Sequence, residues 1–132
     1  FSVLTGVAGM MYAGLLSGTT GSIVAVANVV PNVAVQLYEF VVTGQLHHAL
    51  ALQRAIAPLA RAVTQQHGVA GLKAAMALAG FPASTPRLPL APASDAVVDE
   101  LRGLLRHLEA FTGRTLIGSA GRDSARLEGQ PS

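Results

Sequence analysis

The fold is decided by residues 1–27, which read FSVLTGVAGMMYAGLLSGTTGSIVAVA. Residues 1–5 form a short apolar run that ends at Gly6, and such a run is typical of a buried strand. The stretch 8–17 has a helical composition, and Gly18 suits the left-handed residue that commonly follows a helix. A strand followed by a helix is therefore predicted.

A second strand is predicted over residues 20–27. Its centre is continuously apolar and rich in β-branched residues, a pattern typical of a parallel strand that is covered on both faces. The strand, helix and strand together form a βαβ unit close to the usual minimum of about 30 residues. Two parallel strands do not form a stable sheet alone, because their edges and faces need partners. The unit therefore indicates the end of a larger α/β fold.

Helical patterns follow the second strand and continue to about Phe111. Pro31 suits the first turn of a helix, and Ser94 or Asp95 suits the cap of the last one. Apolar periodicity and breaks at glycine or proline predict helices over residues 31–43, 46–66, 69–79 and 95–111, with a proline-rich connector over residues 82–94.

A helical tail after the last strand favours a (β/α)8 barrel whose other strands precede residue 1. The predicted class is α/β, with the last two strands of a (β/α)8 TIM barrel over residues 1–30 and a C-terminal helical extension over residues 31–111. Residues 112–132 are rich in Gly, Ser and Arg, and we expect a disordered tail there. The chain begins with Phe1 rather than Met, which we interpret as the start of a processed or truncated product.

The composition argues against several classes of protein. The net charge is only +2 and the basic residues are scattered, so no nucleic-acid partner is expected. There is no Cys, which excludes disulfides and thiolate chemistry. The most apolar window, residues 22–42, contains Asn28, Pro31 and Asn32, so a membrane span is disfavoured. No basic region precedes the first apolar run, so a secretory signal is not expected.

Four segments together resemble a known family. Residues 1–6 (FSVLTG) and 17–31 (SGTTGSIVAVANVVP) resemble the last two barrel strands of the dihydrodipicolinate synthase and N-acetylneuraminate lyase family of class I aldolases. The family pattern there is a strand ending in Gly, a helix, and then Gly-x-x-Gly-x-Ile-x-x-x-x-Asn-x-x-Pro. Residues 71–76 (GLKAAM) and 87–92 (RLPLAP) fit the family's C-terminal helices, so the resemblance extends over about residues 1–111.

The residue after Gly6 does not decide which substrate the family resemblance implies. Residues 3–9 and 66–73 look closest to 4-hydroxy-2-oxoglutarate aldolases. Dihydrodipicolinate synthases usually carry acidic residues just after the glycine, and the aldolase relatives carry a small hydroxyl residue where this chain has Val7. The resemblance therefore implies either a synthase-like or an aldolase-like activity.

The resemblance also implies the chemistry. A lysine amine of the family forms a Schiff base with pyruvate or a related 2-oxo acid, and the Schiff base is the electron sink for an aldol step; no cofactor is implied. The family's lysine lies on the strand before Phe1, whereas the one lysine of this chain, Lys73, matches a lysine of the C-terminal helices. We therefore predict a structural role for Lys73, in helix capping or an ion pair, and no activity of the chain alone. A homotetramer and a cytoplasmic location are implied, with the mitochondrion as the alternative.

The candidate substrate-binding residues are Gly6, Val7 and Ile23. In a barrel the chemistry gathers at the carboxyl ends of the strands, and Gly6 and Val7 directly follow the first strand. A missing side chain lets backbone approach a ligand, and free amides there can meet a carboxylate. By resemblance, the main-chain carbonyl of Ile23 faces the Schiff-base region. The alternatives are a tight turn at Gly6 and a barrel-core position for Ile23.

Other polar residues receive structural interpretations. Asn28 either donates into the site or organises its own turn, and the turn is favoured. Tyr12 lies in the helix predicted between the two strands, and a packing role is expected for it. His47 and His48 are adjacent on a helix, where side chains point about 100° apart, so surface positions are predicted rather than a metal site. The competing hypothesis for the whole chain is a non-catalytic helical packing or oligomerisation module.

Overall fold

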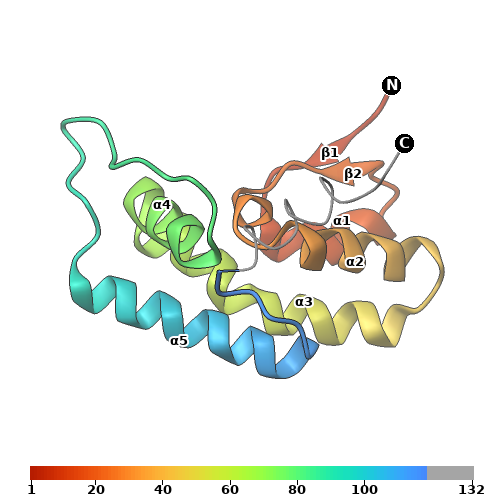
Figure 1. The fold of residues 1–132 in the computed structure, drawn as a ribbon. Helices are drawn as coiled ribbons and strands as arrows, with labels where there is room; N and C mark the ends of the chain where they lie inside the picture. Colours follow the sequence, from red (N-terminus) through yellow and green to blue (C-terminus); the bar gives the residue numbers. More distant parts are fainter. Residues whose placement is uncertain (119–132) are drawn as a thin grey trace, which may run out of the picture.

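The computed structural model describes residues 1–118, in which a short parallel sheet lies at one end of a group of helices (Figure 1). The elements in chain order, with η for 3-10 and π-helical turns, are β1 (Leu4–Thr5), η1 (Ala8–Met10), α1 (Met11–Leu16), β2 (Gly21–Ser22), η2 (Ala25–Asn28), α2 (Pro31–Val42), α3 (Leu46–Arg61), η3 (Ala62–Gln66), α4 (Gly68–Ala79) and α5 (Asp95–Thr112).

The predicted strand, helix and strand are present. β1 and β2 pair in parallel, with Leu4 opposite Gly21 and Thr5 opposite Ser22. The 3-10 turn η1 and the helix α1 connect them. Gly18 follows α1 with a φ of +95°, a left-handed conformation that glycine adopts without steric cost. The predicted α/β class is therefore confirmed.

Both strands are shorter and more exposed than predicted. Residues 25–28 form the 3-10 helix η2, in which Val26 is fully buried, so the prediction of a strand through residue 27 is wrong. A continuously apolar run does not distinguish a buried strand from a buried helical turn. Val3 and Leu4 are half-exposed, because within residues 1–118 no further strand covers them. A buried first strand was predicted, but the strand is half-exposed.

The helices follow the predicted boundaries closely. α2 begins at Pro31 in its first turn. α3 continues into the π-helical turn η3, and together they form the one long helix that was expected. α4 ends at Ala79, and Gly80 follows it in a left-handed conformation. α5 is capped by Ser94, whose hydroxyl accepts a hydrogen bond from the backbone N–H of Val97 at 3.4 Å.

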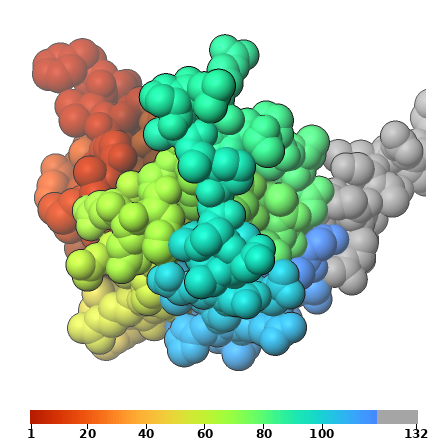
Figure 2. Space-filling view, turned by 90° about the vertical axis from the view of Figure 1, so that its left-hand side faces the viewer, coloured from red at the N-terminus to blue at the C-terminus, as the bar shows by residue number. Residues whose placement is uncertain are grey.

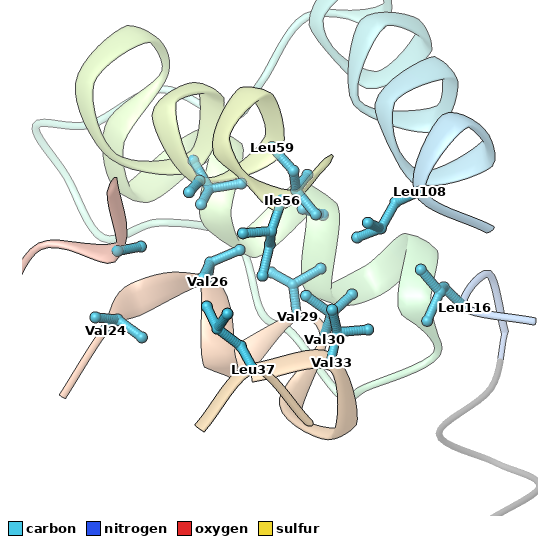
Figure 3. Close-up of a cluster of buried hydrophobic side chains, with 14 of the residues drawn as sticks. Val24, Val26, Val29, Val30, Val33, Leu37, Ile56, Leu59, Leu108 and Leu116 are labelled. Atoms are coloured by element: carbon cyan, nitrogen blue, oxygen red, sulfur yellow. The ribbon is translucent and has the colours of Figure 1, made fainter. Parts of the chain in front are cut away.

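The apolar core lies where η2 and the start of α2 meet α3 and α5. Figure 3 shows Val26, Val29 and Val33 on one side of this cluster, and Ile56 of α3 and Leu108 of α5 on the other. Each of these side chains is buried, and full burial of one such residue contributes about 1.5–3 kcal/mol to folding. Within the described part of the chain, no helix has both the length and the hydropathy that a membrane span requires.

Residues 113–118, which follow α5, are held by specific contacts. The carboxylate of Glu109 accepts hydrogen bonds at 2.6 and 2.8 Å from the backbone N–H groups of Leu116 and Ile117. The N–H of Gly118 donates to the carbonyl of Leu78 at 2.9 Å, and Leu116 is buried. The prediction that disorder begins at residue 112 is therefore wrong for residues 112–118, and the rest of that predicted tail lies outside the described residues. One carboxylate and one apolar side chain hold the segment in a way that periodicity does not reveal.

Candidate functional site

The carboxyl ends of β1 and β2 lie side by side. The N–H of Thr20 donates to the carbonyl of Val3 at 2.8 Å, and the N–H of Ile23 donates to the carbonyl of Thr5 at the same distance. Because the strands are parallel, Gly6 and Ile23 each follow a strand at the same end. The structure therefore brings together two of the three predicted substrate-binding residues.

The two faces of this small sheet differ. The hydroxyls of Thr5 and Ser22 are 2.5 Å apart on one face, and the methyl of Thr5 packs over Gly14 of α1. The other face carries Leu4, whose side chain lies over Gly21. Side chains alternate between the faces of a strand, so positions 6 and 23 belong to the face of Leu4. Ile23 is 74% exposed there within the described residues.

Val7 continues the chain in an extended conformation, with φ −116° and ψ 117°. Its carbonyl accepts a hydrogen bond from the N–H of Met10 at 2.9 Å, which starts the 3-10 turn η1. The Val7 side chain is half-exposed. Gly6 and Val7 therefore form the short link between the end of β1 and η1, at the edge where Ile23 lies.

Lys73 lies on α4, in a different part of the fold from the strand ends (Figure 1). Its Nζ donates a hydrogen bond to Ser84 Oγ at 3.1 Å. Ser84 belongs to the connector that crosses the face shown in Figure 2 between α4 and α5. A shallow pocket of about 170 Å³ opens beside Lys73, lined mainly by alanines and prolines of α4 and the connector. Within residues 1–118, Lys73 thus tethers the connector and makes neither the cap nor the ion pair that was predicted.

The remaining candidates have local partners. The Asn28 side chain donates to the carbonyl of Ala25 at 3.2 Å, the contact expected of a residue that organises its own turn. Tyr12 is half-buried and packs against the apolar core. The His48 ring lies beside the Phe40 ring, with ring centres 5.5 Å apart and the two planes tilted by 35°. In residues 1–118, no group of three His, Cys, Asp or Glu side chains is placed to hold a metal ion.

Sequence reasoning missed Gln53. This side chain is buried on α3 and bonds the backbone of Tyr12 and Ala8, at 2.9 and 3.0 Å. Its position was visible in the pattern, because it falls on the same helical face as the buried Ala49, Ile56 and Ala60. A polar residue in the inward stripe of a helix is unusual enough to mark a specific contact.

The comparisons with known proteins agree with this geometry. A model of the dihydrodipicolinate synthetase family matches residues 1–108. The chain is 34% identical over 113 residues to a 4-hydroxy-tetrahydrodipicolinate synthase of Methanothrix thermoacetophila. The aligned residues make up 86% of this chain and 38% of that protein. The chain belongs to the dihydrodipicolinate synthetase family. It spans less than two fifths of the length of this relative.

Solved structures give the same result. Dihydrodipicolinate synthase from Thermotoga maritima has a TM-score of 0.75 and 33% identity, over 82% of this chain and 37% of that one. A prophage protein of the family from E. coli K12, determined in complex with pyruvate, has a TM-score of 0.73 and 28% identity, over 83% and 37% of the two chains. The predicted family is thus confirmed, and the closer resemblance to 4-hydroxy-2-oxoglutarate aldolases stays a prediction.

Proposed function

We propose that this chain forms the carboxyl-terminal part of a Schiff-base lyase that acts on pyruvate or a related 2-oxo acid. Membership of the dihydrodipicolinate synthetase family supports the class of enzyme, and the pyruvate complex of the E. coli relative supports the substrate. The observation that carries the proposal is the placement of Gly6 and Ile23 at the carboxyl ends of two parallel strands, where a (β/α)8 barrel carries out its chemistry.

In this proposal residues 1–30 are the last two strand units of the barrel, and residues 31–111 are its helical extension. Gly6 and Val7 offer backbone to the carboxylate of the 2-oxo acid, because glycine leaves room for a close approach. The Ile23 carbonyl faces the Schiff base. The nucleophilic lysine comes from a strand that precedes residue 1 in the intact enzyme, and its amine must be unprotonated to attack. The protonated Schiff base is itself the electron sink, so the reaction needs no cofactor.

Borohydride reduction in the presence of pyruvate tests the proposal, because it converts a Schiff base into a stable adduct. The enzyme in which residues 1–132 follow the rest of the barrel should gain one reduced pyruvyl group, located by peptide mass spectrometry upstream of Phe1. The 132-residue chain alone should gain none, and Lys73 should remain unmodified in both. An adduct on Lys73 would contradict the assignment, and an intact enzyme without any adduct would refute the proposed function.

The product that the intact enzyme forms identifies its substrate. Synthase-like activity forms 4-hydroxy-tetrahydrodipicolinate, whereas aldolase-like activity releases pyruvate from 4-hydroxy-2-oxoglutarate. Val7 is neither acidic nor hydroxylated, so it provides no charge or hydrogen bond after Gly6. We propose 4-hydroxy-2-oxoglutarate-like substrates on the resemblance of residues 3–9 and 66–73. Formation of 4-hydroxy-tetrahydrodipicolinate without release of pyruvate would contradict this choice.

A second candidate function is a helical packing or oligomerisation module, and α2 gives it specific support. Val35, Tyr38 and Val42 are exposed at positions i, i+3 and i+7 of this helix, which places them on one face. In the enzyme, the same face would contact another subunit of the implied tetramer. Sedimentation of the intact enzyme with Val35→Lys and Val42→Lys tests this contact. Dissociation into smaller assemblies supports the subunit contact through α2, and an unchanged mass of the assembly contradicts it.

A further inference from the structure

Gln53 is a buried polar side chain to which the reaction proposed above assigns no part. It is 7% exposed and lies on α3. Its Oε1 accepts a hydrogen bond from the backbone N–H of Tyr12 at 2.9 Å, and its Nε2 donates to the carbonyl of Ala8 at 3.0 Å. These partners precede Gln53 by 41 and 45 residues. One side chain thus joins the helical extension to the segment that follows β1.

The two backbone groups that Gln53 binds have the spacing of a hydrogen-bonded pair in an α-helix. Ala8 and Tyr12 are four residues apart, the spacing at which a regular α-helix joins a carbonyl and an N–H directly. The Gln53 amide bonds both groups where η1 passes into α1, and a side chain inserted into this ladder sets the local direction of a helix. Val7 directly precedes η1 and accepts a hydrogen bond from Met10 of that turn, so the direction of η1 determines how Gly6 and Val7 leave β1.

We propose that Gln53 is a positioning residue, whose amide holds η1 and α1 in the orientation at which Gly6 and Val7 meet the carboxylate of the 2-oxo acid. This inference rests on the function proposed above. The role requires one acceptor and one donor at the end of an unbranched side chain, which an amide supplies. The helical extension then shapes the substrate site directly, in addition to packing against the barrel.

Two variants and a control in the intact enzyme test the role. Gln53→Met keeps the length of the side chain but offers no comparable donor or acceptor, and Ile56→Val perturbs the same helix without touching a polar contact. Gln53→Met should raise the KM for the 2-oxo acid substrate roughly tenfold, within the roughly 10²-fold effect that a displacement of about 1 Å can have. Its kcat should change by less than about twofold, since a contact to the carboxylate is present before and during the reaction. Ile56→Val should lower the Tm and leave KM unchanged.

Gln53→Glu gives a signature that a merely structural role would not produce. Burial raises the pKa of the introduced carboxyl above its ordinary value, because desolvation disfavours the charged form. The neutral acid can accept from Tyr12 and donate to Ala8, whereas the carboxylate can only accept. The KM of Gln53→Glu, divided by that of the wild type at the same pH, should therefore fall toward one as the pH is lowered through this pKa. The same ratio for Gln53→Met should stay flat.

The outcomes separate the two proposals. A wild-type enzyme that traps no pyruvate refutes the proposed function itself. A wild type that traps pyruvate and turns over its 2-oxo acid substrate, with an unchanged KM in Gln53→Met, overturns the positioning role alone. A pH-independent ratio for Gln53→Glu also overturns it, and this profile decides the matter if Gln53→Met does not fold.

Discussion

At the level of single residues, Gly14 shows how closely α1 approaches β1. A Cβ atom added at Gly14 would overlap the methyl group of Thr5. Thr5 has little freedom to turn away, because its hydroxyl lies 2.5 Å from that of Ser22 on the neighbouring strand. The close approach of helix and strand, rather than an unusual backbone conformation, therefore requires glycine at this position.

Replacement of Gly14 by Ala should lower the free energy of unfolding by about 1–3 kcal/mol, the usual cost of overpacking. This loss should exceed the gain of up to about 1 kcal/mol that alanine brings to a helix. Gly103→Ala on α5 is the control, since an added Cβ there meets nothing within 4 Å; it should raise stability by about 0.5–1 kcal/mol. Urea unfolding measures both, and equal stabilities of the two variants would contradict the predicted clash.

Gly6 and Ile23 could be named from the sequence, but their proximity could not. Gly6 ends an apolar run and Ile23 lies within one, so both follow from local patterns and the family resemblance. Their common position at one sheet edge depends on the register of Thr5 with Ser22. That register pairs residues 17 positions apart, which local patterns do not show. The partners of Gln53 were hidden for the same reason, because they are distant backbone groups that no side-chain pattern marks.

At the level of elements, α5 organises the segment that follows it. Its buried leucines pack against α3 and α4, and Glu109 near its end accepts two backbone hydrogen bonds from residues 116 and 117. Hydrogen bonds to a charged group are stronger than neutral ones. The helix therefore acts as the anchor for residues 113–118, and Leu116 completes the core beside Leu108 (Figure 3).

Glu109→Ala should release this segment and lower the free energy of unfolding by about 1–3 kcal/mol, because partly buried N–H groups lose an acceptor. Glu109→Gln should retain most of the stability, since its amide oxygen can still accept. Hydrogen exchange of the Leu116 and Ile117 amides measures the release and should accelerate in Glu109→Ala only. Exchange in Glu109→Ala as slow as in the wild type would show that the Glu109 side chain is not the anchor.

The helices themselves were predictable because the periodicity and the breaks agree. Pro31, Gly68 and Gly80 stand at or next to helix ends in the structure as in the prediction. The second strand was predicted wrongly over residues 25–27, where only packing against several helices shows that the apolar run forms a 3-10 turn. Local propensity is weak evidence when tertiary contacts oppose it.

At the scale of the whole molecule, the sheet leaves an apolar face open. Leu4 and Ile23 are exposed on it, and Val3 and Val7 are exposed nearby. Apolar surface of this kind on a sheet with unpaired edges favours association with other chains. In the proposed enzyme the earlier barrel strands cover this face.

The isolated 132-residue chain should therefore self-associate. The weight-average sedimentation coefficient should rise with concentration for the wild type, and it should rise much less for the double variant Leu4→Thr and Ile23→Thr, which keeps a high strand propensity. Val69→Thr is the control, because Val69 is 49% exposed, about as much as Leu4 at 50%, but lies on α4. A monodisperse wild-type monomer with a cooperative thermal transition would contradict the prediction and weaken the proposal that residues 1–30 complete a barrel.

The amino-acid sequence by itself determined the helices, the parallel strand pair and the family, because these follow from periodicity, glycine and proline positions and ordered motifs along the chain. Only the tertiary structure decided how far β2 extends, which residues share the open face, and that Gln53 joins α3 to η1 and α1. These features depend on contacts between distant segments, whose hydrogen bonds and burial are defined only when the chain is folded.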